Sequence, residues 1–193
     1  MRVPLRSFVR RPSGPGWQAG LNLQPPEGAR ETPAAARWLA LALATGAGAG
    51  LSPVVPGTVG SAVGVLLYLP LAGLGAPLYA LTALALVALG IWAADLAERI
   101  FAGKDDGRIV IDEVAGQLLT LVPVVALAPP EALRSPVWLV TGFVAFRLFD
   151  IWKPGPVRWA ERNFRGGAGV VLDDVIAGLF AAALLAAAIL VVA

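Results

Sequence analysis

The sequence contains no cysteine and no histidine. The absence of cysteine excludes disulfide bonds, thiolate metal sites and cysteine nucleophiles. The absence of histidine excludes imidazole bases, phosphohistidine intermediates and the usual zinc ligands. Any chemistry must therefore come from carboxylates, lysines, arginines, hydroxyls and backbone amides. Such oxygen-rich ligands suit a hard cation, and Mg²⁺ fits this description best.

Charge is also scarce. Only 15% of the 193 residues are charged and 58% are hydrophobic, and the mean hydropathy is +0.75. This composition is too apolar for a soluble domain and predicts an integral membrane protein in the lipid bilayer. The net charge of +2 is too small to indicate a nucleic-acid partner. The sequence leaves open whether the protein forms a homo-oligomer.

The first 33 residues form a basic arm rich in proline and glycine. The arm has no apolar core and no small-residue cleavage site, so it does not resemble a secretory signal. We expect a disordered cytoplasmic arm over residues 1–33 and a membrane domain over residues 34–193. A solvated tail is the favoured interpretation of the arm, although its arginines could contact anionic lipid headgroups.

Apolar segments follow one another along the membrane domain. Residues 34–51 begin as a helix and loosen into glycines, which favours an interfacial or re-entrant segment over a full span. Five further apolar segments, each near the lower length limit for spanning, are expected at residues 61–75, 77–94, 114–128, 137–152 and 175–193. Together they predict an all-α integral membrane bundle with about four to five membrane-embedded helices.

The loops between these segments differ in charge. One side of the predicted bundle carries only Arg134, and by the positive-inside rule the other, basic side faces the cytoplasm. The basic side holds Arg99, Lys104, Arg108, Lys153, Arg158, Arg162 and Arg165. Five acidic residues lie at helix ends that open onto that same cytoplasmic side: Asp112, Glu113, Asp150, Asp173 and Asp174.

Two acidic pairs precede separate apolar segments, in IDEVAG and LDDVIAG. Taken alone, each pair is typical of a helix N-cap, because an acid there binds a free amide and complements the helix dipole. Capping needs one acid, however, and the pattern of two acids followed by a small residue occurs twice on one side of the membrane. Clustered carboxylates repel one another unless a divalent cation lies between them. The repetition therefore favours a Mg²⁺ site.

A third motif, FRLFDIWKPGPVRW, places Arg147, Asp150 and Lys153 at spacings that share one helix face. An arginine inside an apolar helix needs a partner, and Asp150 is the nearest acid. A structural ion pair, with Lys153 reaching the headgroups, and a role in binding metal and phosphate are equally compatible with this spacing. Pro154 and Pro156 are expected to end the helix and hold an extended turn.

A fourth motif, LSPVVPGTVGS, combines two prolines and two glycines with hydroxyl side chains just before a helix. The free amides of a helix N-terminus can bind an anion. This motif is common in ordinary turns, so it gains weight only from lying on the same side as the acids. The candidate phosphate-binding residues here are Ser52, Gly57, Thr58, Gly60 and Ser61.

In their order and spacing, these four motifs resemble the phosphatidylglycerophosphatase A family, from about Leu39 to the C-terminus. The resemblance implies a bacterial inner-membrane enzyme that uses Mg²⁺ to remove the terminal phosphate of phosphatidylglycerophosphate and yields phosphatidylglycerol. It implies an acid set for metal and water, consisting of Asp112, Glu113, Asp150, Asp173 and Asp174, and basic phosphate-binding positions at Arg147 and Lys153, with Lys153 also catalytic. No catalytic role is expected for the loop AGKDDGRIV with Asp105 and Asp106.

Two other functions fit the residues. Intramembrane carboxylates with an arginine partner also occur in small ion or proton transporters, although such sites tend to lie near the middle of the bilayer. A phosphatase for another membrane lipid phosphate fits the residues equally well. Only the family resemblance favours phosphatidylglycerophosphate as the substrate.

Overall fold

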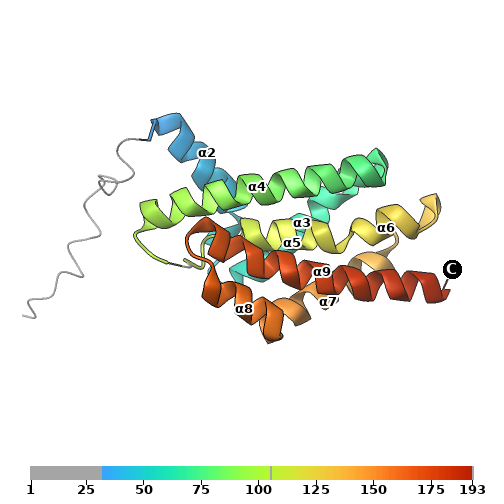
Figure 1. Cartoon of the computed structure of the whole chain (residues 1–193). Coiled ribbons are helices and arrows are strands. Elements are labelled where there is room, and N and C mark those ends of the chain that lie inside the picture. The colour runs from blue at the N-terminus through green and yellow to red at the C-terminus, as the bar shows by residue number, and fades with distance from the viewer. Residues whose placement is uncertain (1–31, 105, 193) are drawn as a thin grey trace, which may run out of the picture.

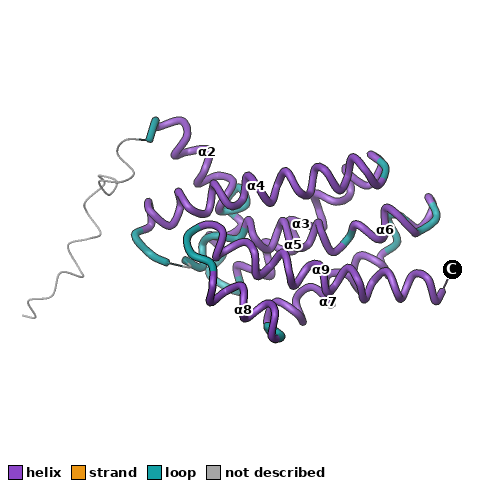
Figure 2. Tube along the Cα trace, in the orientation of Figure 1, coloured by secondary structure: helices purple, strands orange, loops and turns teal. Residues whose placement is uncertain are grey.

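The structure is a computed structural model that describes residues 32–104 and 106–192, and these residues contain helices and turns without a β-strand (Figures 1 and 2). Nearly all of the predicted arm, residues 1–31, lies outside the described residues. The helices are α2 (Ala34–Ala44), α3 (Pro56–Leu71), α4 (Ala76–Phe101), α5 (Ile111–Thr120), α6 (Val122–Leu127), α7 (Pro136–Trp152), α8 (Gly155–Asn163) and α9 (Gly167–Val192). Short 3₁₀ turns occur at Ala49–Leu51 (η2), Ala72–Leu74 (η3) and Pro130–Ala132 (η4).

Helix α9 is the centre of the bundle, since it packs against α4, α5, α6, α7 and α8. In Figure 1 it runs the length of the molecule beside α5 and α6. Small residues allow α5 and α9 to approach closely: a Cβ atom added at Gly178 would lie 2.6 Å from the carbonyl oxygen of Gly116. Helices in membranes commonly pack through such small residues.

Three helical stretches are long and apolar enough to cross a membrane, namely Pro56–Leu74, Ala76–Phe101 and Gly167–Val192. They present large apolar side chains outward, including Leu66 at 64% exposure and Leu190 at 66%. This surface suits acyl chains and confirms the predicted helical membrane bundle. Helix α2, with 11 residues, is about 16 Å long and too short to span a bilayer.

Several helix boundaries differ from the sequence prediction, and α3, for example, begins at Pro56 instead of residue 61. Helices α4 and α9 are both longer than the predicted segments 77–94 and 175–193 at the end of the bundle that carries the acids. Helix α4 continues through charged residues to Phe101, and α9 begins at Gly167 and so includes Asp173 and Asp174. The predicted segment 114–128 is divided at Leu121 into α5 and α6. Pro123, which has no backbone amide to donate, lies in the first turn of α6 and explains the break.

The extended turn predicted at Pro154 and Pro156 is wrong in part. Helix α7 does end at Trp152, but a new helix, α8, begins at Gly155 with Pro156 in its first turn. Proline is well tolerated there because amides in the first turn have no intrahelical partner. Helix α8 lies beside the beginning of α9 (Figure 1).

Candidate active site

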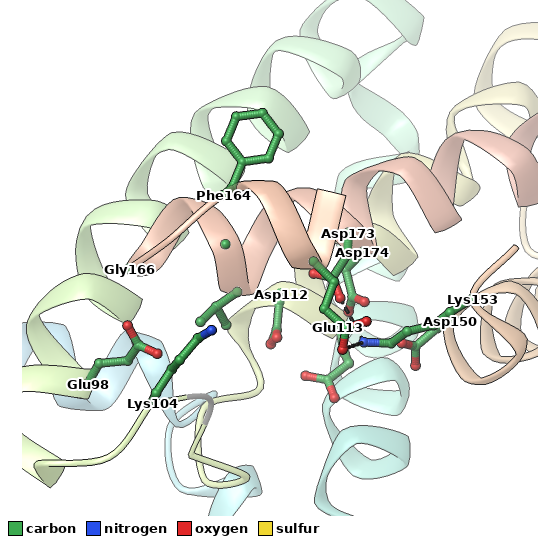
Figure 3. Close-up of a pocket in the computed structure, with 13 residues that line it drawn as sticks. Glu98, Lys104, Asp112, Glu113, Asp150, Lys153, Phe164, Gly166, Asp173 and Asp174 are labelled. Carbon is green, nitrogen blue, oxygen red and sulfur yellow. Dashed lines mark hydrogen bonds and ion pairs between the residues drawn. The ribbon is translucent and has the colours of Figure 1, made fainter. Parts of the chain in front are cut away.

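A cavity of about 200 Å³ lies at the end of the bundle where α4 and α7 finish and α5 and α9 begin (Figure 3). Every acid predicted for the site lines this cavity, so residues from three separate helices do converge as expected. The lining residues are Glu98, Lys104, Asp112, Glu113, Asp150, Lys153, Glu161, Phe164, Gly166, Gly169, Val170, Asp173 and Asp174.

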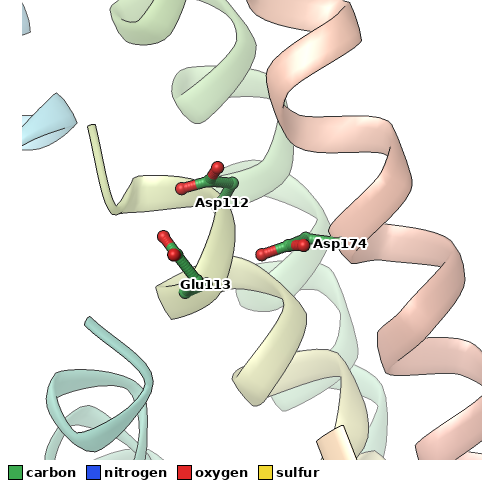
Figure 4. Close-up of side chains that lie close together, drawn as sticks. All are labelled: Asp112, Glu113 and Asp174. Carbon is green, nitrogen blue, oxygen red and sulfur yellow. The ribbon is translucent and has the colours of Figure 1, made fainter. Parts of the chain in front are cut away.

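Three of the lining residues, Asp112, Glu113 and Asp174, lie close together, and we call them the acid cluster (Figure 4). One carboxylate oxygen from each lies within 4.8 Å of the others. Asp112 is 9% exposed and Asp174 is 3% exposed. In each of the three side chains, one buried oxygen has no hydrogen-bond partner among the described residues. Buried carboxylates without partners are costly, and a divalent cation between them would remove that cost.

Capping does not account for these acids. The N-cap residue of α5 is Val110, and no side chain makes a capping hydrogen bond there. Asp173 and Asp174 were expected to begin a helix, but α9 begins at Gly167, so they lie well inside it. A capping residue must lie beside the free amides of the first turn. Asp112 and Glu113 do lie in the first turn of α5 and complement its dipole, but neither capping nor the dipole accounts for Asp174. The oxygen ligands of the acid cluster fit Mg²⁺.

Lys153 bridges two acids at the wall of the cavity. Its Nζ lies 2.9 Å from Oδ2 of Asp173 and 2.8 Å from Oε1 of Glu161. Burial lowers the pKa of Lys153, but the hydrogen bonds to Glu161 and Asp173 outweigh burial, and the pKa is raised above its ordinary value. The side chain therefore carries a stable positive charge. The other oxygen of Asp173, Oδ1, is buried without a partner among the described residues.

Arg147 pairs with Asp150, as the sequence predicts. Its Nη1 lies 2.6 Å from Oδ2 of Asp150 and 3.9 Å from Oε1 of Glu113. The predicted stripe of three residues stops there, because Lys153 follows the helix with a φ of 47° and leaves the face that Arg147 and Asp150 share. Arg147 also donates to Oγ of Ser61 at 3.4 Å, so it joins α7 to α3 behind the acid cluster.

The motif of hydroxyl and glycine residues at the start of α3 packs against Glu113 of the acid cluster, on the side away from the cavity. A side chain at Gly57 would overlap Oε1 of Glu113. Ser61 is fully buried and donates to the carbonyl of Gly57 at 3.0 Å, and Gly60 packs closely on Val110 of the chain leading into α5.

Two predicted features of this motif differ in the structure. The amides of Thr58 and Val59 donate to the carbonyl of Val55, so they are already used within the helix start. The hydroxyl of Ser52 bonds the carbonyl of Val54 in a local turn. Direct phosphate binding by Ser52, Gly57, Thr58, Gly60 and Ser61 stays a prediction.

Sequence reasoning missed Glu98, Lys104 and Glu161 as cavity residues. Lys104 belongs to the loop for which no catalytic role was expected, yet it lines the cavity (Figure 3). The same loop holds Asp106, which pairs with Arg108 at 2.7 Å, while Asp105 lies outside the described residues. Glu161 could have been found only by recognising α8, since that helix turns it toward Lys153.

Comparisons with known proteins show the family of the chain. The family model described as "Phosphatidylglycerophosphatase A" matches residues 42–189. Phosphatidylglycerophosphatase A of Escherichia coli K12 is 37% identical over 143 residues, which cover 74% of this chain and 79% of that protein. The protein of the same name from Haemophilus influenzae is 33% identical over 140 residues, covering 72% and 82%.

A third relative carries a different name. A Bacteroides thetaiotaomicron protein, provisionally named phosphatidylinositol-3-phosphatase, is 41% identical over 157 residues that cover 78% of this chain and 94% of that protein. No solved structure matches the chain. The family model spans most of the described residues and includes the whole acid cluster, and the chain belongs to the phosphatidylglycerophosphatase A family.

Proposed function

We propose that this chain is a Mg²⁺-dependent phosphatase that hydrolyses phosphatidylglycerophosphate to phosphatidylglycerol and phosphate in glycerophospholipid biosynthesis. The observation that carries the proposal is the acid cluster, which holds three buried, unpartnered carboxylate oxygens at one end of a membrane bundle. Membership of the family supports the choice of substrate.

Asp112, Glu113 and Asp174 would hold the Mg²⁺ ion, because their free oxygens are hard ligands gathered in one place. When bound, the ion polarises phosphoryl oxygens and makes a bound water more acidic. A metal is needed on grounds of magnitude. Hydrolysis of phosphate monoesters requires accelerations of up to about 10²¹, whereas side-chain acid-base catalysis alone contributes about 10² to 10⁴.

The neighbouring side chains supply charge and a proton acceptor. Lys153, held by Asp173 and Glu161, faces the cavity and neutralises charge on the phosphoryl oxygens. The free Oδ1 of Asp173 accepts the proton of the attacking water. The water oxygen bonds to phosphorus and the phosphorus–oxygen bond to the lipid breaks. The lipid oxygen takes up a proton from solvent water, and Asp173 later returns its proton to solvent.

Arg147 acts from behind the cluster. By pairing with Asp150 and lying near Glu113, it fixes these two carboxylates and offsets part of their repulsion. It is a positioning residue in this proposal, because it does not line the cavity. The buried contact with Ser61 anchors its guanidinium to α3.

The site would face the cytoplasm of a bacterial inner membrane. Helices α4 and α7 finish and α5 begins at the end of the bundle that holds the site, and the loops there are basic. Arg134 lies at the opposite end, where it donates to the carbonyl of Leu69. The positive-inside rule supports this orientation. A cavity at one end of the bundle also differs from transporter sites, which lie in broken helices near the bilayer midplane.

The test is phosphate release by purified protein from phosphatidylglycerophosphate in detergent micelles, with Mg²⁺ or with a chelator. We expect release only with Mg²⁺, and a loss of at least 100-fold, on the order seen for removal of one electrostatic contact, in Asp174→Asn. Glu131→Gln is the matched control, because Glu131 is exposed at the opposite end of the bundle. Release that persists in the chelator would sink the proposal.

A second substrate is favoured by the Bacteroides relative, whose name specifies phosphatidylinositol-3-phosphate. Both lipids present a phosphomonoester at the membrane surface, and the cavity binds that group in either case. The same assay with phosphatidylinositol-3-phosphate separates the two. A kcat/KM at least tenfold higher for phosphatidylglycerophosphate supports our first choice, and the reverse ratio would assign the second.

A further inference from the structure

Helix α8 has two different faces. Val157 and Ala160 are buried against the bundle, and Glu161 turns toward the cavity. The other face exposes Arg158, Trp159 and Arg162, with Trp159 at 55% exposure. The apolar face of α8 is used to pack on the bundle, so the basic, aromatic face is the one left for the surroundings, and such residues are typical of surfaces at the level of lipid headgroups.

The arginines of this surface differ from four other cations at the same end of the bundle. Arg99, Arg108, Arg147 and Lys153 each pair with an acid. By contrast, three exposed arginines form no ion pair with any residue in the part of the chain that the structure describes: Arg158, Arg162 and Arg165. Three positive charges within eight residues are therefore available to interact with anions outside the protein.

Aromatic side chains flank these charges. Trp159 packs edge-on against Phe164 with ring centroids 5.7 Å apart. Trp152 and Ile151, at the end of α7, are 69% and 72% exposed. Tryptophan is enriched where acyl chains meet headgroups, so this combination of rings and arginines matches the level of lipid headgroups and the upper acyl chains.

We infer that the outer face of α8, defined by Arg158, Trp159, Arg162 and Arg165, binds the headgroups of anionic phospholipids at the bilayer surface. Charge complementarity selects the occupant, because an exposed face with three arginines fits a negatively charged surface, while Glu161 of the same helix pairs with Lys153. The position of α8 gives the contact a consequence that rests on the proposed function. Glu161 and Phe164 line the cavity, so anionic lipid held by α8 lies at its mouth, where an anionic lipid substrate enters.

The absence of cysteine from the chain allows a direct test. A fluorophore is attached to Asn163→Cys, next to the arginines, in full-length protein in phosphatidylcholine nanodiscs. Quenching is compared for a small fraction of quencher-labelled phosphatidylserine and of quencher-labelled phosphatidylcholine. Phosphatidylserine is neither the substrate nor the product of the proposed reaction, so the measurement is independent of the active site.

We expect stronger quenching by phosphatidylserine, with a preference of up to roughly fivefold per arginine at low salt that weakens at high salt. Replacing all three arginines by glutamine should abolish the preference, and replacing them by lysine should keep it. A fluorophore at Glu131→Cys, at the other end of the bundle, should show none. Equal quenching by both lipids in the otherwise unchanged protein would overturn the inference, as would dimerisation through α8 that shields the fluorophore from lipid.

Discussion

Gly57→Ala is the substitution that tests the geometry of the acid cluster most selectively. Gly57 lies in the first turn of α3, and a Cβ atom there would overlap Oε1 of Glu113 and lie 3.4 Å from Nη1 of Arg147. The overlapping atom is the end of a flexible side chain, so the Glu113 carboxylate must move by roughly 1 Å to restore normal contact. Alanine is otherwise favourable in a helix.

The expected result is a loss of activity without a loss of stability. A displacement of about 1 Å in a catalytic group can cost about 100-fold in rate, which corresponds to about 2.7 kcal/mol of transition-state stabilisation. The melting temperature should stay the same or rise slightly, because glycine is replaced by a better helix former.

The assay is phosphate release from phosphatidylglycerophosphate, together with thermal unfolding in the same detergent. Gly73→Ala is the matched control, since a Cβ atom there meets nothing within 4 Å. The reasoning is refuted if Gly57→Ala keeps more than half of the kcat of the unchanged protein. A large fall in the melting temperature of Gly57→Ala would also contradict the reasoning, because the loss of activity would then come from a loss of folded structure.

Three further predictions concern the cavity and the packing around it. Lys153→Met should lower kcat by at least about 100-fold whereas Lys153→Arg keeps part of the activity, and equal loss in both variants would contradict a role for the positive charge. Gly178→Val should destabilise the protein by about 1 to 3 kcal/mol, because its Cβ would lie 2.6 Å from the carbonyl oxygen of Gly116; an unchanged melting temperature would argue against the close α5–α9 contact. Mg²⁺ at 100 times its Kd should raise the free energy of unfolding of the unchanged protein by about 2.7 kcal/mol, which is seen as a higher melting temperature, and should not raise that of Asp174→Asn.

The sequence predicts the class of fold well because its apolar composition indicates a membrane protein and its apolar segments have the length of membrane-embedded helices. Helix ends were predicted less well. Apolarity marks the part of a helix that lies in lipid, and α4 continues past Ala94 through polar residues that no hydropathy pattern reveals. Helix α8 was missed since its prolines and charges are typical of loops, and it is stabilised by burying Val157 and Ala160 against neighbouring helices.

The sequence predicts five of the acids that line the cavity. It misses the cation Lys104 and the acids Glu98 and Glu161. Repetition of the acid pairs on one side of the membrane was enough to bring Asp112 and Asp174 together in the prediction. The pairing of Lys153 with Glu161 depends on the left-handed backbone at Lys153 and on α8, neither of which a linear motif shows. Lys104 reaches the cavity from a loop whose path is set by tertiary contacts, so its place could not be inferred from spacing.

The central claim is that the acid cluster binds a divalent cation. It is tested most directly by titrating metal-free protein with Mn²⁺, as a spectroscopic substitute for Mg²⁺, and following bound metal by electron paramagnetic resonance. The account predicts saturable binding that weakens by more than about tenfold in Asp112→Asn and in Asp174→Asn, but not in Asp106→Asn, whose carboxylate pairs with Arg108. Binding that is absent in the unchanged protein, or equal in all three variants, would contradict it.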